Sequence, residues 1–281
     1  MQNKYITQEL NQNNQISYQI THPLFSASIS QFGGQLLSFT PNDKADVLWL
    51  SNSAITDGSK PIRGGVPICW PWFGPAQSPF KGEPQHGYIR SVNWQITLVE
   101  ETDQTLCIEL KPELPAELVN SLKLDVKLVY RFTDSATIEL HTTNLGDSNF
   151  VLGAALHTYF NVTDVTQTHI AALDNCQYID KLAHVTTTQS GKLLIDKPLD
   201  RIYLHQDAKL SIATPSRMIN LKHTGHDSVV VWTPWQTGAE KLADFDDLGY
   251  LSMLCIEAAV TQGYVLEPKQ SHVLVQEISV G

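Results

Sequence analysis

The chain has 281 residues, and its 19 Lys and Arg against 29 Asp and Glu give a formal net charge of −10. Charged residues make up 17% and hydrophobic residues 42%, which excludes a disordered chain, since disorder needs more charge and less apolar surface. The acidic balance also excludes a protein that follows a nucleic-acid backbone, because such proteins carry clustered basic residues.

Residues 1–15 are polar and rich in Asn and Gln, so we expect them to be loosely ordered or to form a short helix. They lack the apolar segment of a signal peptide. No apolar run in the chain approaches the roughly 18 residues of a membrane helix. We therefore expect a cytoplasmic protein that has no membrane partner.

From residue 16 onward, apolar and polar residues alternate with a period of two, the pattern of a half-buried strand. The clearest case is 123–132, where alternate residues from Leu124 to Phe132 are apolar and share one face. Strands are also predicted at 16–21, 24–31, 105–111, 136–143, 151–157, 209–213, 218–222, 228–233, 250–258 and 271–279. Many short strands separated by Gly, Pro, Asn, Asp and Ser predict an all-β fold, a large antiparallel β-sandwich.

Helical signals are few. Pro112 and Pro115 oppose a long helix over residues 112–121, and residues 238–247 have room for one or two helical turns. No linker, composition shift or internal repeat divides the chain. We therefore predict a single domain over residues 1–281 with few short helices.

The first functional candidate is the segment 61–75, which reads Pro-Ile-Arg-Gly-Gly-Val-Pro-Ile-Cys-Trp-Pro-Trp-Phe-Gly-Pro. So much Gly and Pro excludes a regular strand or helix. The segment is either a rigid surface loop packed by its own aromatic residues or a preshaped binding loop. In the second case Trp70 and Trp72 are apolar platforms and Arg63 is a fork for an anion.

Three further segments carry titratable groups. His86 and Arg90 lie four residues apart, and a lone histidine such as His86 is more often structural than functional. His157 ends an apolar run, where partial desolvation would tune its pKa, although a hydrogen-bonded core histidine is the alternative. Glu257 lies between Ile256 and two alanines, and a carboxylate there is costly unless it is paired or functional.

No phosphate-binding loop, dinucleotide fingerprint, nucleophile elbow or zinc-helix motif occurs in the sequence. The ten histidines lack metal-ligand spacing in an apolar context. His223 and His226 lie in a polar turn, and we expect them to be solvated. The four cysteines form no CxxC pair, which favours free thiols in a reducing compartment. We expect no metal and no cofactor.

Five segments, in this order, resemble the glucose-6-phosphate 1-epimerases, also called hexose-6-phosphate mutarotases, of the aldose 1-epimerase superfamily. They are Arg-Gly-Gly-Val-Pro-Ile-Cys-Trp-Pro at 63–71, Gln-His-Gly-Tyr-Ile-Arg at 85–90, Leu-His-Thr-Tyr-Phe at 156–160, Asp-Arg-Ile-Tyr at 200–203 and Cys-Ile-Glu-Ala at 255–258. Each segment alone is moderately specific. Together they extend the resemblance from about residue 24 to the end of the chain.

The resemblance implies a galactose-mutarotase-like β-supersandwich. It also implies an isomerase that interconverts the α and β anomers of a hexose 6-phosphate, with glucose 6-phosphate as the expected substrate. By motif, Glu257 takes the general-base position and His157 the general-acid position. Among the substrate-binding positions, His86 matches a second active-site histidine and Asp200 a carboxylate that contacts the sugar, whereas Arg63 and Arg90 match basic positions that we assign to the phosphate.

Two positions depart from the family pattern, which commonly has Gln in place of Trp72 and Asn in place of Thr233. Both lie near sugar-contacting segments, so they bear on the identity of the substrate. Two alternatives stay open: an aldose 1-epimerase for unphosphorylated sugars, and a non-catalytic carbohydrate-binding protein that stacks sugar on Trp70 and Trp72. We expect a monomer whose partner is a small sugar phosphate, and no nucleic acid.

Overall fold

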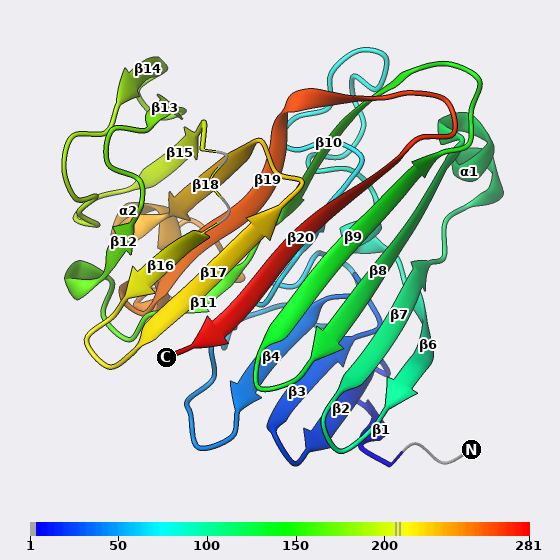
Figure 1. The fold of residues 1–281 in the computed structure, drawn as a ribbon, viewed down its shortest axis with the longest axis horizontal. Coiled ribbons are helices and arrows are strands. Elements are labelled where there is room, and N and C mark those ends of the chain that lie inside the picture. The colour runs from blue at the N-terminus through cyan, green and yellow to red at the C-terminus, as the bar shows by residue number, and fades with distance from the viewer. Residues whose placement is uncertain (1–3, 206, 208) are drawn as a thin grey trace.

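The computed structural model describes residues 4–205, 207 and 209–281, and these residues form three sheets of antiparallel strands (Figure 1). In Figure 1 the sheet that contains β17, β20 and β9 lies over the sheet that contains β18, β19 and β10. Apolar side chains from all three sheets belong to one continuous core cluster. The predicted antiparallel β-sandwich is confirmed.

The first sheet contains the N-terminal strands in chain order. They are β1 (Ile6–Leu10), β2 (Ile16–His22), β3 (Phe25–Ser30) and β4 (Leu36–Pro41). The third sheet runs in the order β12 (His169–Ala171), β16 (Lys209–Ala213), β17 (Met218–Thr224), β20 (Ser271–Val280), β9 (Ala136–Asn144), β8 (Leu124–Phe132), β7 (Leu106–Pro112) and β6 (Trp94–Glu101).

The second sheet carries the candidate site. Its order is β14 (Val185–Thr188), β13 (Gln177–Asp180), β15 (Leu199–Tyr203), β18 (Ser228–Thr233), β19 (Met253–Leu266), β10 (Phe150–Leu156) and β5 (Ile68–Cys69). The short strand β11 (Tyr159–Asn161) continues the line of β10 and also pairs with β19.

Burial explains why the strands differ in sequence. Along β9, buried and half-buried residues alternate over the whole strand, as expected when one sheet face meets the core. In β19, every residue from Met253 to Val260 is buried. Its outer face is therefore covered as well, which accounts for its nearly unbroken apolar run.

Part of the cover over the second sheet comes from the connection between β4 and β6, residues 42–93, and part from the segment after β18, where Ala239 and Phe245 pack against Met253 and Cys255. Close backbone approaches hold the connection in place. Gly65 and Gly87 have φ of +58° and +75°, and a Cβ on them would lie 2.2 Å from the Leu36 carbonyl oxygen and 1.8 Å from the Trp70 carbonyl oxygen, respectively. Only glycine fits at either position, so these residues shape the loop that rims the site.

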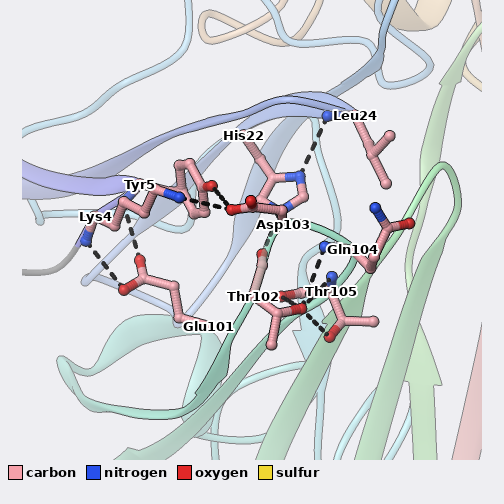
Figure 2. A network of polar contacts seen from close by, with 9 residues as sticks. All are labelled: Lys4, Tyr5, His22, Leu24, Glu101, Thr102, Asp103, Gln104 and Thr105. Carbon is pink, nitrogen blue, oxygen red and sulfur yellow. Dashed lines mark hydrogen bonds and ion pairs between the residues drawn. The ribbon is translucent and has the colours of Figure 1, made fainter.

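The N-terminal segment differs from the expectation. Residues Ile6–Leu10 form an edge strand paired with β2, not a helix. Figure 2 shows how this end is tied to the β6–β7 turn: Glu101 accepts hydrogen bonds from the backbone N–H groups of Lys4 and Tyr5, and Asp103 accepts from their side chains. Residues 1–3 lie outside the described part of the chain.

The helices are short, as predicted. The seven-residue helix α1 (Ala116–Leu122) begins directly after Pro115, and α2 (Trp235–Ala239) has five residues. Within the described residues, neither helix has the length or apolar composition that a membrane span requires. The predicted strand at 250–258 begins later, at Met253, because Gly249–Leu251 forms a 3₁₀ turn.

Candidate active site

Glu257 lies on β19 near the middle of the second sheet, opposite Val230 of β18. On its other side, the registers of β10 and β11 with β19 are the same, so His157, between those two strands, comes opposite Glu257. The Nε2 atom of His157 lies 3.4 Å from Oε1 of Glu257. The β-sheet register therefore brings together an imidazole and a carboxyl group that are 100 positions apart in sequence.

The Glu257 carboxyl group is 1% exposed, and neither of its oxygens has a hydrogen-bond partner among the described residues. Its contact with His157 is within ion-pair distance but lacks the alignment of a hydrogen bond. Burial raises the pKa of Glu257 well above its usual value; Asp200 raises it further and Lys181 opposes this. The Glu257 carboxyl group therefore keeps its proton to a higher pH than an exposed glutamate does.

The imidazole of His157 is held between aromatic rings. It stacks on Tyr159 with 5.0 Å between centroids and meets Trp232 edge-on at 6.0 Å. Its backbone N–H donates to the Pro67 carbonyl oxygen at 2.9 Å. Burial lowers the pKa of His157 well below 6.5, and the nearby His86 and Arg63 lower it further. The imidazole of His157 therefore stays neutral to a lower pH than an exposed histidine does.

His86 enters the site from the covering connection, with its ring centroid 6.1 Å from that of His157. Its Nδ1 accepts a hydrogen bond from the Gly74 N–H at 3.2 Å. Burial, with Arg90 as the next contribution, lowers the pKa of His86 to about 3. His86 is therefore neutral near pH 7 and carries its proton on Nε2, which makes that atom a hydrogen-bond donor.

Two arginines lie at the rim in different electrostatic settings. Arg63 donates to Asp244 from Nε and Nη2, at 3.3 and 3.4 Å, and to the Tyr159 hydroxyl from Nη1 at 3.0 Å. Arg90 donates from Nη2 to the Gln85 carbonyl oxygen at 2.7 Å and forms no ion pair within the described residues. The charge of Arg63 is thus partly balanced, whereas that of Arg90 is not.

These groups surround a cavity of about 340 Å³, within the usual size range for small-molecule sites. The structure brings together all the predicted site residues except the two tryptophans. Its lining residues are Lys60, Pro61, Ile62, Arg63, Pro67, Phe73, Gln85, His86, Arg90, His157, Tyr159, Lys181, Asp200, Val230, Trp232, Asp244 and Glu257.

The two tryptophans correct the expectation of a stacking platform. Trp70 is fully buried, and its Nε1 donates to Thr142 Oγ1 inside the sandwich, so no face of its ring is free for a ligand. Trp72 instead stacks on Phe80, at 5.0 Å between centroids, in a separate groove that does not include the acid/base pair. The ring that lines the cavity from this segment is Phe73.

Several lining residues were not predicted from the sequence. Tyr159 is two residues from His157, so the period-two rule could have placed it on the same face. Lys181 forms a 3.2 Å ion pair with Asp200, and Asp244 follows α2, but no local pattern distinguishes either from an ordinary surface charge. Tertiary folding alone brings them to the cavity.

One group of potential metal ligands occurs in the described residues: His157, Cys255 and Glu257 offer donor atoms within 4.8 Å of one another. Burial raises the pKa of the Cys255 thiol well above its usual value. A metal ion there would have to displace the proton of the thiol. The three donor atoms are close enough to share an ion, but the raised pKa of the Cys255 thiol opposes its binding.

The fold is a galactose-mutarotase-like β-sandwich, and its cavity holds the adjacent imidazole of His157 and carboxyl group of Glu257. The sequence model of the family described as Aldose 1-epimerase matches residues 17–279, and the chain belongs to this family. It is accordingly an epimerase, or mutarotase, of the kind that acts on sugars. This membership confirms the superfamily resemblance drawn from the five sequence segments.

Two relatives carry the printed name "Putative glucose-6-phosphate 1-epimerase". The Salmonella typhimurium protein is 33% identical over 90% of this chain and 84% of its own length. The Escherichia coli protein is 33% identical over 93% of this chain and 89% of its own. A crystal structure described as a putative mutarotase from Salmonella typhimurium superposes with a TM-score of 0.89 at 28% identity, covering 100% of this chain and 95% of that one.

Proposed function

We propose that this protein interconverts the α and β anomers of a hexose 6-phosphate, with glucose 6-phosphate as the first candidate. The observation that carries the proposal is the burial of the Glu257 carboxyl group without hydrogen-bond partners among the described residues. The group lies 3.4 Å from His157, in a cavity rimmed by arginines. Buried polar atoms without partners are rare unless a ligand supplies the partners.

Mutarotation requires two proton transfers and no electron transfer. A base removes the proton from the O1 hydroxyl while an acid protonates the ring oxygen, and the C1–O5 bond breaks to give the open aldehyde. Rotation about C1–C2 presents the other carbonyl face, and the same steps run in reverse. We assign Glu257 as the base and His157 as the acid; each proton transfer contributes roughly 10²–10⁴-fold.

The number of protons bound by Glu257 and His157 together fits this chemistry. The roles require one shared proton, on His157 at the start, whereas burial shifts that proton towards Glu257. A sugar hydroxyl that donates to the Glu257 oxygens would stabilise the carboxylate, lower its pKa and move the proton to His157. Substrate binding itself would thus complete the catalytic state.

The basic residues at the rim of the cavity favour a phosphorylated sugar as the substrate. Arg63, Arg90 and Lys60 line the cavity, and guanidinium groups suit the geometry of a phosphate. His86, a neutral donor, and Asp200, paired with Lys181, are assigned to sugar hydroxyls. The names of the two bacterial relatives point to the same substrate class.

Anomer exchange measured by NMR tests the proposal. The wild-type protein should accelerate exchange between the α and β signals of glucose 6-phosphate. Glu257→Gln should reduce the rate by about 10²-fold or more, because the base is lost. No acceleration by the wild type, or full activity in Glu257→Gln, contradicts the proposed function.

A specific observation favours the second candidate, an epimerase of unphosphorylated sugars. Asp244 lies beside Arg63 and adds a negative charge where a phosphate would bind. The two arginines separate the candidates. If the substrate is phosphorylated, Arg90→Ala should raise KM for glucose 6-phosphate by about tenfold or more. Arg63→Ala should raise it less, because Asp244 already balances part of its charge.

The same variants assayed with free glucose provide the control, since KM for glucose should change little. Equal changes in KM for both sugars, or a wild-type protein that prefers glucose, would favour the free-sugar epimerase.

A further inference from the structure

The backbone hydrogen bonds that pair β19 with the neighbouring strand are interrupted next to His157, the candidate acid. Thr158 and Ile256 lie opposite each other, and the Ile256 N–H donates to the Thr158 carbonyl oxygen at 3.2 Å. The return bond is missing, because the Thr158 N–H donates instead to the Leu156 carbonyl oxygen at 2.9 Å. That bond closes a γ-turn around His157. The Ile256 carbonyl oxygen is therefore left without its ladder donor.

Gln276 supplies the missing donor from the other sheet. It lies on β20, is fully buried, and donates from Nε2 to the Ile256 carbonyl oxygen at 3.1 Å. Its Oε1 accepts a hydrogen bond from the Thr158 hydroxyl. One amide thus contacts the residue before Glu257 and the residue after His157, and it does so across the core between two sheets.

His223 sets the orientation of this amide from the next strand. It lies opposite Gln276 in the β17–β20 register, and its Nε2 is 3.0 Å from Nε2 of Gln276. The sequence suggested a solvated His223, but the residue is 1% exposed, because its side chain faces the core from β17. Burial and the neighbouring His226 lower the pKa of His223 to about 3, so its Nε2 is free to accept.

We propose that Gln276 is a positioning residue for the acid/base pair: its amide replaces the ladder bond that the γ-turn at His157 removes, and so holds His157 opposite Glu257. Every polar atom of the amide has a matching partner, because a carbonyl oxygen and a neutral imidazole nitrogen accept while a hydroxyl donates. Gln276 does not line the cavity. Its effect must therefore act through the two strands and not through contact with substrate.

This inference rests on the proposed function for its kinetic readout. In the full chain, Gln276→Met keeps the length of the side chain and removes its hydrogen bonds. We expect kcat for anomer exchange of glucose 6-phosphate to fall about tenfold or more while KM stays within about twofold. The NMR titration of the His157 imidazole should shift as well, because its distance from Glu257 changes.

Tyr130→Phe is the matched control. It removes a different buried hydrogen bond, from the Tyr130 hydroxyl to the Gly34 carbonyl oxygen at 2.7 Å, on the same sheet. It should lower the melting temperature and leave kcat unchanged. If Gln276→Met does not fold, Thr158→Val removes one of the bonds to the amide, and Thr158→Ser should restore kcat relative to it by keeping the hydroxyl.

The outcomes separate the two proposals. A Gln276→Met enzyme that keeps wild-type kcat overturns the positioning role, whatever its melting temperature. A wild-type protein that accelerates no anomer exchange overturns the proposed function alone. The His157 titration then still decides the positioning role, and an unchanged curve in Gln276→Met overturns it.

Discussion

The Glu257 carboxyl group is buried and the His157 imidazole nearly so, with 14% of its side chain exposed, and the two groups lie 3.4 Å apart. Burial acts on them in opposite directions, raising the pKa of Glu257 and lowering that of His157. Between these two pKa values the pair holds a single proton. Such groups titrate as one unit, and the apparent pKa values belong to the pair.

The rate of anomer exchange should therefore follow a bell-shaped dependence on pH. On the acidic side the rate should fall below pH 6.5, where a second proton binds to the pair. On the alkaline side it should fall at a pH well above 4.5, where the shared proton is lost. Glu257→Gln should abolish the alkaline limb along with most of the rate. Activity that keeps rising through pH 9 would contradict a shared proton as the active state.

At the scale of the elements, the period-two pattern located part of the strands and missed others, including the longer β4 (Leu36–Pro41) and β6 (Trp94–Glu101). Predicted strands at 136–143, 218–222 and 271–279 match β9, β17 and β20 within two residues at each end. Short strands such as β5 and β11 were not predicted, since two or three residues show no period. The covering connection 42–93 has almost no regular structure, so its path depends on glycines and tertiary contacts.

Gly87→Ala should disrupt this connection beside His86. The new Cβ would lie 1.8 Å from the Trp70 carbonyl oxygen at a φ of +75°, so the backbone must move. We expect a loss of more than about 2 kcal/mol in the free energy of unfolding, together with a large loss of activity. Urea unfolding monitored by tryptophan fluorescence measures the free energy of unfolding.

Gly191→Ala is the matched control for backbone conformation. Its φ is +68°, but nothing lies within 4 Å of the added Cβ. It should cost only the strain of a left-handed alanine, about 1–2 kcal/mol, and leave activity intact. Equal losses in the two variants would mean that the close approach at Gly87 is not a constraint.

At the scale of the whole molecule, the −10 net charge should slow the approach of an anionic substrate. A single phosphate nevertheless needs only one or two well-placed forks. The cavity concentrates Arg63, Arg90, Lys60 and Lys181 in an otherwise acidic protein. The anion preference proposed here is thus a local property that the overall charge does not reveal.

The buried histidines should make the fold sensitive to acid. The pKa values of His86 and His223 are lowered to about 3, so as pH falls below about 6.5 the unfolded chain binds protons before the folded one. Stability present at pH 7 should therefore be lost progressively between pH 6.5 and 3. The loss by pH 5 is about 2 kcal/mol for each histidine, while the shifts of His157 and Glu257 act on stability in opposite directions.

Denaturant unfolding at pH 7, 6 and 5 measures this loss. Unchanged or greater stability at pH 5 would contradict neutral, buried histidines.

The sequence by itself determined the fold class and most of the site. Alternation along a strand is a local property. The local chemistry around Arg63, His86, Arg90, His157, Asp200 and Glu257 left structural roles open, and the resemblance of their segments to a known family marked them as one site. The tertiary structure decided which way each side chain faces. Trp70 and Trp72 share a motif with Arg63, yet they lie outside the cavity, because their indole groups pack in the core and in a second groove. His223 and Gln276 looked unremarkable in sequence, and their role depends on the stacking of two sheets, which brings β20 against β19. Local patterns specify strands, whereas contacts between sheets depend on how those strands pack.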